Sequence, residues 1–281
     1  MKKKWLISAD SGYDLPEEIV KRFDVRTIYI WLILGEKSGY ENEFTQTELY
    51  EYADRTGTLP KTAALSPAAY EERFREYLDE AEEVVHISLS SGISSSNQNA
   101  SIAAESLGHV HVIDSKNLSS GFGHLVYRLG EMLEGGMEVE AAVKETERLT
   151  EKVDTSFILD TLEYMRKGGR CSAVAVLGAN LLKLKPCIEV KDGKMGVGKK
   201  YRGNLVEVLK KYVDDRLADL ENIEDFRIFV THAGVKPEVE KEIYEYVKAK
   251  NYFKEVLIGH ASCTISTHCG PNTLGVLFFR K

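Results

Sequence analysis

The chain has 281 residues, 43% of them hydrophobic, so it is long enough to bury a substantial core in one large or two ordinary domains. Its formal net charge of −7, with acidic and basic residues mixed along the chain, argues against nucleic acid as the main partner because phosphate binding needs a basic face. Because no apolar stretch approaches the roughly 20 residues that span a bilayer, and the four scattered cysteines lack the paired spacing of metal ligands, we expect a cytoplasmic protein with reduced, buried thiols and no metal.

The first half of the chain alternates apolar strand patterns with amphipathic helix patterns. The predicted strands are 5–9, 25–34, 84–90 and 109–114, and the predicted helices are 16–23, 45–55, 67–81, 97–106, 120–133 and 138–153. This order favours an α/β fold, with a mostly parallel sheet that carries helices on both faces.

The second half has a different order of predicted strands and helices. Its predicted strands are 156–159, 187–190, 195–197, 227–231, 256–258 and 274–279, and its predicted helices are 161–167, 173–184, 205–220 and 237–250. Asp192-Gly193 is a strong hairpin signal because both residues accept positive φ. A hairpin with helices predicts a second, mixed α+β domain. We place the boundary near Thr155, which divides the chain into domains 1–155 and 156–281.

One turn is unusually dense in hydroxyl groups. The apolar pattern of 84–90 runs into Gly92-Ile93-Ser94-Ser95-Ser96, and a helix is predicted to follow. Unpaired N–H groups and the positive end of the helix dipole attract a carboxylate or phosphate to such a junction. The turn therefore predicts a site built around Ser94.

The same turn is one glycine short of the G-x-S-x-G nucleophile elbow, and Ser94, Asp114 and His268 follow the chain order of an α/β-hydrolase triad. Against this, Ser96 replaces the glycine that lets the elbow fold tightly, and Asp114 can cap the turn after its strand. A binding hydroxyl is favoured, and a serine esterase or lipase is the alternative.

Other short motifs are ambiguous alone. The segment Gly193–Lys200 matches most of a phosphate-binding P-loop, but Lys200 replaces the required hydroxyl and no helix follows, so an exposed hairpin is favoured. His268 lies in a predicted polar turn between two strands, and Arg170 follows a glycine pair that suits close approach to an anion or a domain interface. Asp10 is interpreted as a loop or cap residue.

Taken together, these residues resemble the DegV family, which includes the fatty-acid-binding subunits (FakB) of bacterial fatty acid kinase. The resemblance is distributed over nearly the whole chain in a specific order. Its pieces are Ile7-Ser8-Ala9-Asp10-Ser11, Asp14-Leu15-Pro16, Lys61-Thr62, the Ser94 turn, Asp114-Ser115, Gly121-Phe122-Gly123, Asp160-Thr161-Leu162-Glu163-Tyr164, Lys167-Gly168-Gly169-Arg170, Leu184-Lys185-Pro186, Asp192-Gly193, Arg202-Gly203, Thr267-His268 and Gly270-Pro271.

The resemblance implies a two-domain protein that holds one long-chain fatty acid in an apolar tunnel, with the carboxylate near the inter-domain cleft. Family residues matching Thr62, Ser94 and His268 grip that carboxylate, and an arginine matching Arg170 lies close by. An arginine matching Arg202 works with a separate kinase subunit, which uses ATP to convert the carboxylate to an acyl phosphate. The resemblance thus implies a lipid-binding subunit without catalytic residues or a cofactor, in transient contact with membranes.

The chain departs from the family pattern around the expected head group. Thr62-Ala63-Ala64-Leu65-Ser66 stands where Thr-Ser-Gln-Pro-Ser is usual, Ser95-Ser96 replaces Gly-Thr, and Cys269 often corresponds to Thr. Altered ligand preference is therefore expected first at Ser95-Ser96. A lipid carrier or sensor without a kinase partner is a further alternative.

Overall fold

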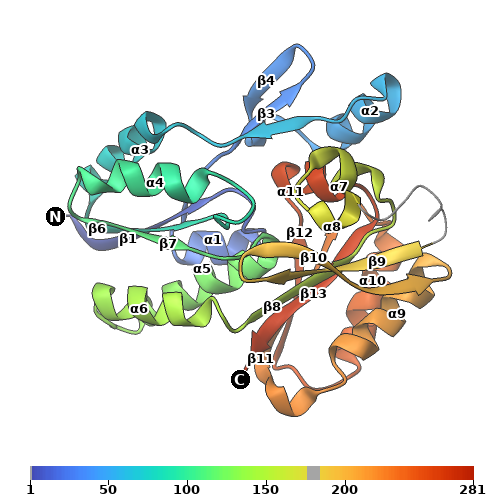
Figure 1. The fold of residues 1–281 in the computed structure, drawn as a ribbon. Helices are drawn as coiled ribbons and strands as arrows, with labels where there is room; N and C mark the ends of the chain where they lie inside the picture. Colours follow the sequence, from blue (N-terminus) through green and yellow to red (C-terminus); the bar gives the residue numbers. More distant parts are fainter. Residues whose placement is uncertain (1, 176–183) are drawn as a thin grey trace.

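The computed structural model describes residues 2–175 and 184–281, and their strands form three sheets (Figure 1). The first sheet has four parallel strands in the order β2-β1-β6-β7. They are β1 (Lys3–Asp10), β2 (Arg26–Ile28), β6 (Ala81–Ser88) and β7 (Val110–Asp114). The helices of this half are α1 (Glu17–Arg22), α3 (Pro67–Glu80), α4 (Ser96–Glu105), α5 (Ser119–Glu134) and α6 (Val139–Leu149).

Helices cover both faces of this sheet, as the sequence predicted (Figure 1). Adjacent residues of β6 show why, because successive side chains of a strand point to opposite faces. Val84 belongs to the cluster with Tyr70 of α3, whereas Val85 belongs to the cluster with Leu125 of α5. All four residues are buried, so the strand is apolar on both sides, as expected of a covered parallel sheet.

The second sheet has six strands in the order β10-β9-β8-β13-β11-β12. Among the described strands of this sheet, only β11 and β12 pair in parallel. Its strands are β8 (Val153–Ile158), β9 (Leu184–Lys191), β10 (Lys194–Arg202), β11 (Ile223–Ala233), β12 (Glu255–His260) and β13 (Thr273–Arg280). Its helices include α9 (Leu205–Arg216) and α10 (Pro237–Lys248), with the short η2 (Leu220–Asn222) between α9 and β11. The mixed second half is confirmed.

A third, antiparallel sheet joins the two halves. It contains β3 (Trp31–Leu34), β4 (Lys37–Tyr40) and β5 (Lys61–Ala63) in the order β4-β3-β5. Along the chain, η1 (Glu41–Glu43) and α2 (Gln46–Thr56) lie between β4 and β5. Leu32 and Leu49 from this segment form a buried cluster with Cys263, which begins α11 (Cys263–Cys269) near the C-terminus. An early segment of the chain is therefore packed against a late helix.

Several boundaries differ from the predictions. Residues 25–34 form two strands in two sheets instead of one, and the predicted polar turn around His268 is part of the helix α11. The helix predicted at 173–184 falls largely outside the described residues; α8 (Ser172–Ala175) precedes that gap, and residue 184 begins β9. The hairpin is confirmed, with φ of 50° at Asp192 and 75° at Gly193. Asp10 is the last residue of β1 and is fully buried, so it is not a loop residue.

The domain division near Thr155 stays a prediction, and Thr155 itself lies within β8. All four cysteines are free and buried, as expected. Among residues 2–175 and 184–281, no helix combines the length and the apolar character needed to cross a bilayer.

Candidate functional site

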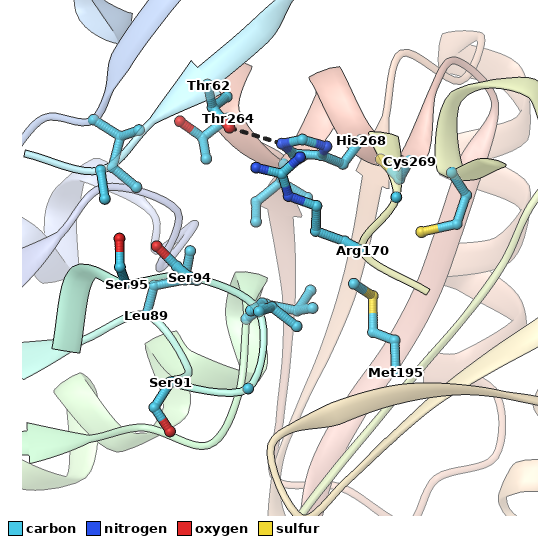
Figure 2. A pocket seen from close by; sticks show the side chains of 18 of the residues that line it. Thr62, Leu89, Ser91, Ser94, Ser95, Arg170, Met195, Thr264, His268 and Cys269 are labelled. Carbon is cyan, nitrogen blue, oxygen red and sulfur yellow. Dashed lines mark hydrogen bonds between the residues drawn. The ribbon is translucent and has the colours of Figure 1, made fainter. Parts of the chain in front are cut away.

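A cavity of about 630 Å³ lies between the loop after β6 and the helix α11 (Figure 2). This volume is typical of a small-molecule site. Its exposed side chains are polar and its buried ones mostly apolar. The exposed polar residues are Ser91, Ser95, Gln98 and Arg170, and buried apolar residues include Leu89, Leu118, Phe157 and Met165. A ligand with one polar end and an apolar body matches this division.

Thr62 and His268 meet at one wall of the cavity. Thr62 lies on β5, His268 lies on α11, and the hydroxyl Oγ1 of Thr62 is 2.8 Å from Nε2 of His268. Burial, together with the nearby positive charge of Arg170, lowers the pKa of His268 to about 3. His268 is therefore neutral near pH 7 and acts through hydrogen bonds instead of a charge.

The surroundings of His268 favour one tautomer. Nδ1 of its ring is buried and has no hydrogen-bond partner among the described residues. A bare nitrogen lone pair is less costly there than a buried N–H without an acceptor. The proton is thus placed on Nε2, which donates to Thr62 Oγ1. The hydroxyl proton of Thr62 is then left for another acceptor, such as a ligand carboxylate.

Two glycines, Gly168 and Gly169, let the chain pass close to His268 and lead to Arg170. Gly168 ends α7 (Glu163–Gly168), and a Cβ added there would lie 2.8 Å from Nδ1 of His268. Gly169 follows with φ of 69°, a left-handed conformation that glycine adopts without strain. The chain then reaches Arg170, which is exposed at the cavity and donates from Nη1 to the carbonyl of Gly168 at 2.7 Å.

Ser94 lies across the cavity from His268 (Figure 2). Its Oγ accepts a hydrogen bond from the N–H of Ser96 at 3.2 Å and lies 2.9 Å from the hydroxyl of Ser96. Ser95 is the N-cap of α4 but makes no side-chain cap hydrogen bond. Ser94 therefore satisfies part of the start of α4 and keeps a half-buried hydroxyl at the cavity.

Buried and inter-segment hydrogen bonds fix the loop that carries Ser94. At its start, the N–H of Leu89 donates to Oδ2 of Asp10 at 2.8 Å, and the hydroxyl of Tyr70 donates to the other oxygen of Asp10. In its middle, Ser90 donates to the carbonyl of Gly193, in the β9–β10 turn, at 2.7 Å. The loop is thus held by both halves of the chain.

Two buried carboxylates hold the start of α11. Glu41 accepts from the N–H of Thr264 at 2.9 Å and from its hydroxyl, and Asp14 accepts from the N–H of Ser262 at 2.9 Å and from the hydroxyl of Ser119. Burial raises the pKa of both carboxyl groups, that of Asp14 to about 7. They lie at the helix end that favours negative charge. Neither residue was predicted from the sequence to have a role at the site.

The hydrolase triad is not assembled. Nε2 of His268 is paired with Thr62, and the hydroxyl of Ser94 is paired with Ser96. Asp114 accepts hydrogen bonds from the N–H and hydroxyl of Ser91. None of the three side chains is hydrogen-bonded to another among the described residues, so the geometry gives Ser94 no general base.

The structure brings four of the five predicted site residues to one cavity, namely Thr62, Ser94, Arg170 and His268. Arg202 is placed elsewhere. It is exposed as the last residue of β10, while Met195, near the start of that strand, lines the cavity.

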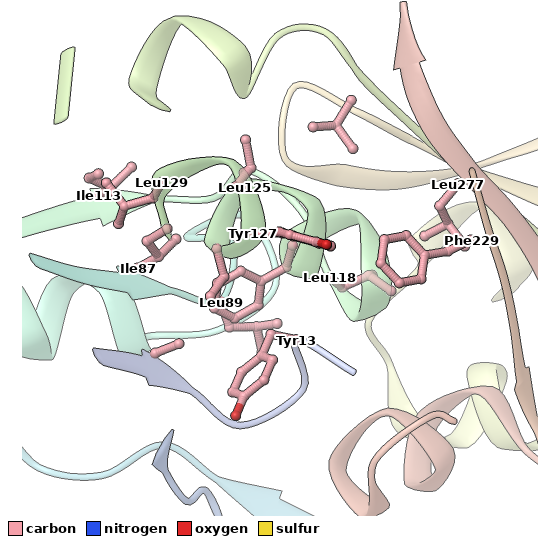
Figure 3. Close-up of a cluster of buried hydrophobic side chains, with 14 of the residues drawn as sticks. Tyr13, Ile87, Leu89, Ile113, Leu118, Leu125, Tyr127, Leu129, Phe229 and Leu277 are labelled. Carbon is pink, nitrogen blue, oxygen red and sulfur yellow. The ribbon is translucent and has the colours of Figure 1, made fainter. Parts of the chain in front are cut away.

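The apolar floor of the cavity continues into the core. A second cavity of about 30 Å³ shares Leu118, Phe157, Ile265 and Cys269 with the first. Figure 3 shows Leu118 between Leu89 on one side and Phe229 and Leu277 on the other. These side chains belong to the same buried cluster along α5. An apolar ligand body that enters the large cavity therefore meets a continuous apolar surface.

Comparison with known proteins gives one consistent family. Residues 4–281 match the family model described as "Uncharacterised protein, DegV family". A DegV domain-containing protein of Clostridium acetobutylicum is 30% identical over 284 aligned positions, covering 99% of both chains.

Two solved structures agree in fold. A DegV family protein from Thermus thermophilus, described as binding fatty acid, has a TM-score of 0.91 and 28% identity, covering 99% of this chain and 100% of the other. A stearic acid-binding protein from Eubacterium ventriosum has a TM-score of 0.83 and 26% identity, covering 100% of this chain and 99% of the other.

Proposed function

This chain belongs to the DegV family, and we propose that it binds a long-chain fatty acid in the cavity between the Ser94 loop and α11. The observation that carries the proposal is the division of that cavity into a polar, exposed part and an apolar, buried part. The fatty-acid binding of the Thermus thermophilus protein and the stearic acid binding of the Eubacterium ventriosum protein support the same ligand class.

The acyl tail supplies most of the affinity in this proposal. Each methylene removed from water contributes about 0.8 kcal/mol, so a tail of about 14 methylenes gains on the order of 10 kcal/mol before the costs of association. The tail lies against the buried apolar residues around Leu118 and Phe157.

The carboxylate is held at the polar end. Thr62 and Ser94 donate hydroxyl hydrogen bonds to it, neutral His268 orients Thr62, and the guanidinium of Arg170 balances its charge. Each hydrogen bond to the charged carboxylate contributes about 1.5–3 kcal/mol. Because Arg170 is exposed, the carboxylate is held where a partner protein can reach it.

We further propose that the bound carboxylate is presented to a separate ATP-dependent kinase subunit in the cytoplasm. A carboxylate oxygen attacks the γ-phosphorus of ATP, the bond to the β-phosphate oxygen breaks, and the products are acyl phosphate and ADP. In this scheme the present chain supplies no catalytic group and needs no cofactor. Arg202, exposed at the end of β10, contacts the kinase subunit.

Native mass spectrometry of gently purified protein tests ligand binding. We expect an added mass in the fatty-acid range, and delipidated protein should take up a long-chain fatty acid again. Thr62→Val should lower the affinity for the fatty acid by about tenfold or more. Thr47→Val, an exposed position on α2, is the matched control and should bind as the wild type does. Delipidated protein that never takes up a fatty acid would contradict the proposal.

The kinase step is tested separately by mixing the loaded protein, ATP and a fatty acid kinase catalytic subunit. Arg202→Ala should keep fatty-acid binding and lose acyl-phosphate formation. Lys241→Ala, which removes an exposed charge on α10, should lose neither. If wild-type protein binds fatty acid but forms no acyl phosphate, the kinase proposal fails and a carrier or sensor role replaces it.

A further inference from the structure

Three side chains with metal-ligand chemistry converge away from the fatty-acid carboxylate site. His232, Glu240 and His260 each offer a ligand atom, and these atoms lie within 4.8 Å of one another. None of the three lines the large cavity. They come from three elements, the strands β11 and β12 and the helix α10.

Strand pairing brings the two histidines together. β11 and β12 are parallel neighbours, and His232 is in register with His260 at the carboxyl ends of both strands. Their imidazole rings lie 4.8 Å apart between centroids, at 84° to each other. The backbone register thus fixes the separation of the two rings before any ion binds.

Glu240 offers the third ligand atom. It lies in the first turn of α10, which follows β11, and its Oε2 is 2.5 Å from Nε2 of His232. Within the described part of the chain, the ion pair formed by Glu240 is with His232 instead of a lysine or arginine. The carboxylate therefore already faces the histidine pair.

His232 is short of polar partners. Its side chain is only 8% exposed, and its Nδ1 is buried without a hydrogen-bond partner among residues 2–175 and 184–281. Pairing with Glu240 uses only Nε2. Among the described residues, Glu240 is thus the only side-chain hydrogen-bond partner of this buried ring.

We propose that His232, Glu240 and His260 form a binding site for Zn²⁺ or a similar divalent transition metal. Two imidazoles and one carboxylate are a set that zinc uses in sites with an open fourth position. Water takes that position, because His260 is exposed. Ligand atoms in a tetrahedral zinc site lie about 3.3 Å apart. Glu240 Oε2, now 2.5 Å from His232 Nε2, must therefore move back slightly, and the exposed His260 must turn its ring toward the other two ligand atoms.

The location suits such a site. Ligands of α/β proteins commonly bind outside the carboxyl ends of parallel strands, where His232 and His260 lie. His232 also borders the small second cavity, together with Ala261 and Cys269. The metal would tie β11, β12 and α10 together beside that cavity. Because Thr62, Ser94 and His268 are not involved, metal binding and carboxylate binding are separable.

Zinc binding is measured on full-length protein without a polyhistidine tag, after removal of metals with a chelator. Titration of Zn²⁺ against a competing fluorescent chelator should show one saturable ion per chain. His260→Ala and Glu240→Gln should each weaken binding by about tenfold or more. His109→Ala, an exposed histidine after α4, is the control and should bind zinc as the wild type does.

Co²⁺ gives a second readout, since a site with histidine and carboxylate ligands at tetrahedral geometry shows a visible absorption band much stronger than that of hexahydrated Co²⁺. This band should appear with the wild type and disappear in His260→Ala. Circular dichroism and thermal unfolding of the metal-free variants check that they fold. No saturable zinc binding by wild type, or equal binding by folded His260→Ala and Glu240→Gln variants, would overturn the proposal.

Discussion

The hydroxyl of Thr62 and Nε2 of His268 are 206 positions apart in the chain and 2.8 Å apart in the structure. The contact joins β5, in the third sheet, to α11, near the C-terminus. It makes the cavity wall depend on the packing of an early segment against a late helix. In the proposed binding mode the two residues have different roles, with Thr62 donating to the ligand and His268 orienting Thr62.

The first prediction concerns the protonation of His268. Its pKa is lowered to about 3 from an ordinary value of 6.5, so the folded protein binds fewer protons at this site than the unfolded chain between those values. This histidine therefore contributes stability above about pH 6.5 that is lost as the pH falls toward about 3. Imidazole NMR should show a neutral ring with the proton on Nε2 from about pH 5 to pH 8. A resonance of His268 that titrates near its ordinary pKa would contradict this.

The second prediction concerns the close approach of Gly168 to the His268 ring. Gly168→Ala places a methyl group 2.8 Å from Nδ1, so the ring must move and its bond to Thr62 is disturbed. Fatty-acid affinity should fall by about threefold to tenfold, the effect of weakening one hydrogen bond. Gly196→Ala, where the added methyl meets nothing within 4 Å, should leave affinity unchanged. Equal affinities for the two variants would show that the close approach of Gly168 does not position His268.

The third prediction concerns the loop that carries Ser94. A Cβ at Gly92 would lie 2.3 Å from the carbonyl oxygen of Gly193, so one backbone segment must shift. Gly92→Ala should lower the free energy of unfolding by about 1–3 kcal/mol. Denaturant unfolding measures this loss, with Gly196→Ala again as the control. A change within experimental error would show that the hairpin turn and the loop adjust without cost.

The fourth prediction concerns the buried carboxyl of Asp14. Burial raises its pKa from 3.8 to about 7, outweighing the hydrogen bonds from Ser119 and Ser262 that favour ionisation. The folded state then holds the extra proton, so the stability that Asp14 contributes is present below about pH 4 and lost as the pH rises through about 7. Asp14→Asn should therefore lose less stability than the wild type between about pH 5 and pH 8, by on the order of 2 kcal/mol. If the free energy of unfolding changed with pH in the same way for both proteins, the raised pKa of Asp14 would be contradicted.

Much of the fold followed from local pattern, and the exceptions have physical causes. The helix α11 was predicted as a turn because its residues are mainly hydroxyl-bearing, β-branched or cysteine, all with weak helix propensity. The local cap of Ser262 and long-range hydrogen bonds to the carboxyl groups of Glu41 and Asp14 hold it instead. Residues 25–34 look like one strand because most of their side chains are apolar or β-branched, while pairing with different neighbours divides them.

Four residues of the large cavity were named from the sequence, but their geometry was not predictable. Resemblance to the family gave Thr62, Ser94, Arg170 and His268, which the fold brings to one cavity. The support from Asp10 and Glu41 was not predictable, since their partners Leu89 and Thr264 lie 79 and 223 positions away. The proposed metal ligands were missed for the same reason. Only the parallel register of β11 with β12 sets His260 beside His232, and no spacing along the chain reveals it.

A crystal structure of the protein saturated with a long-chain fatty acid tests the proposed binding mode directly. We predict elongated density in the large cavity, with the carboxylate within hydrogen-bond distance of Thr62 Oγ1 and Ser94 Oγ and the tail against Leu118 and Phe157. A fatty acid bound outside this cavity, or bound inside it with the tail toward Thr62, would contradict this binding mode.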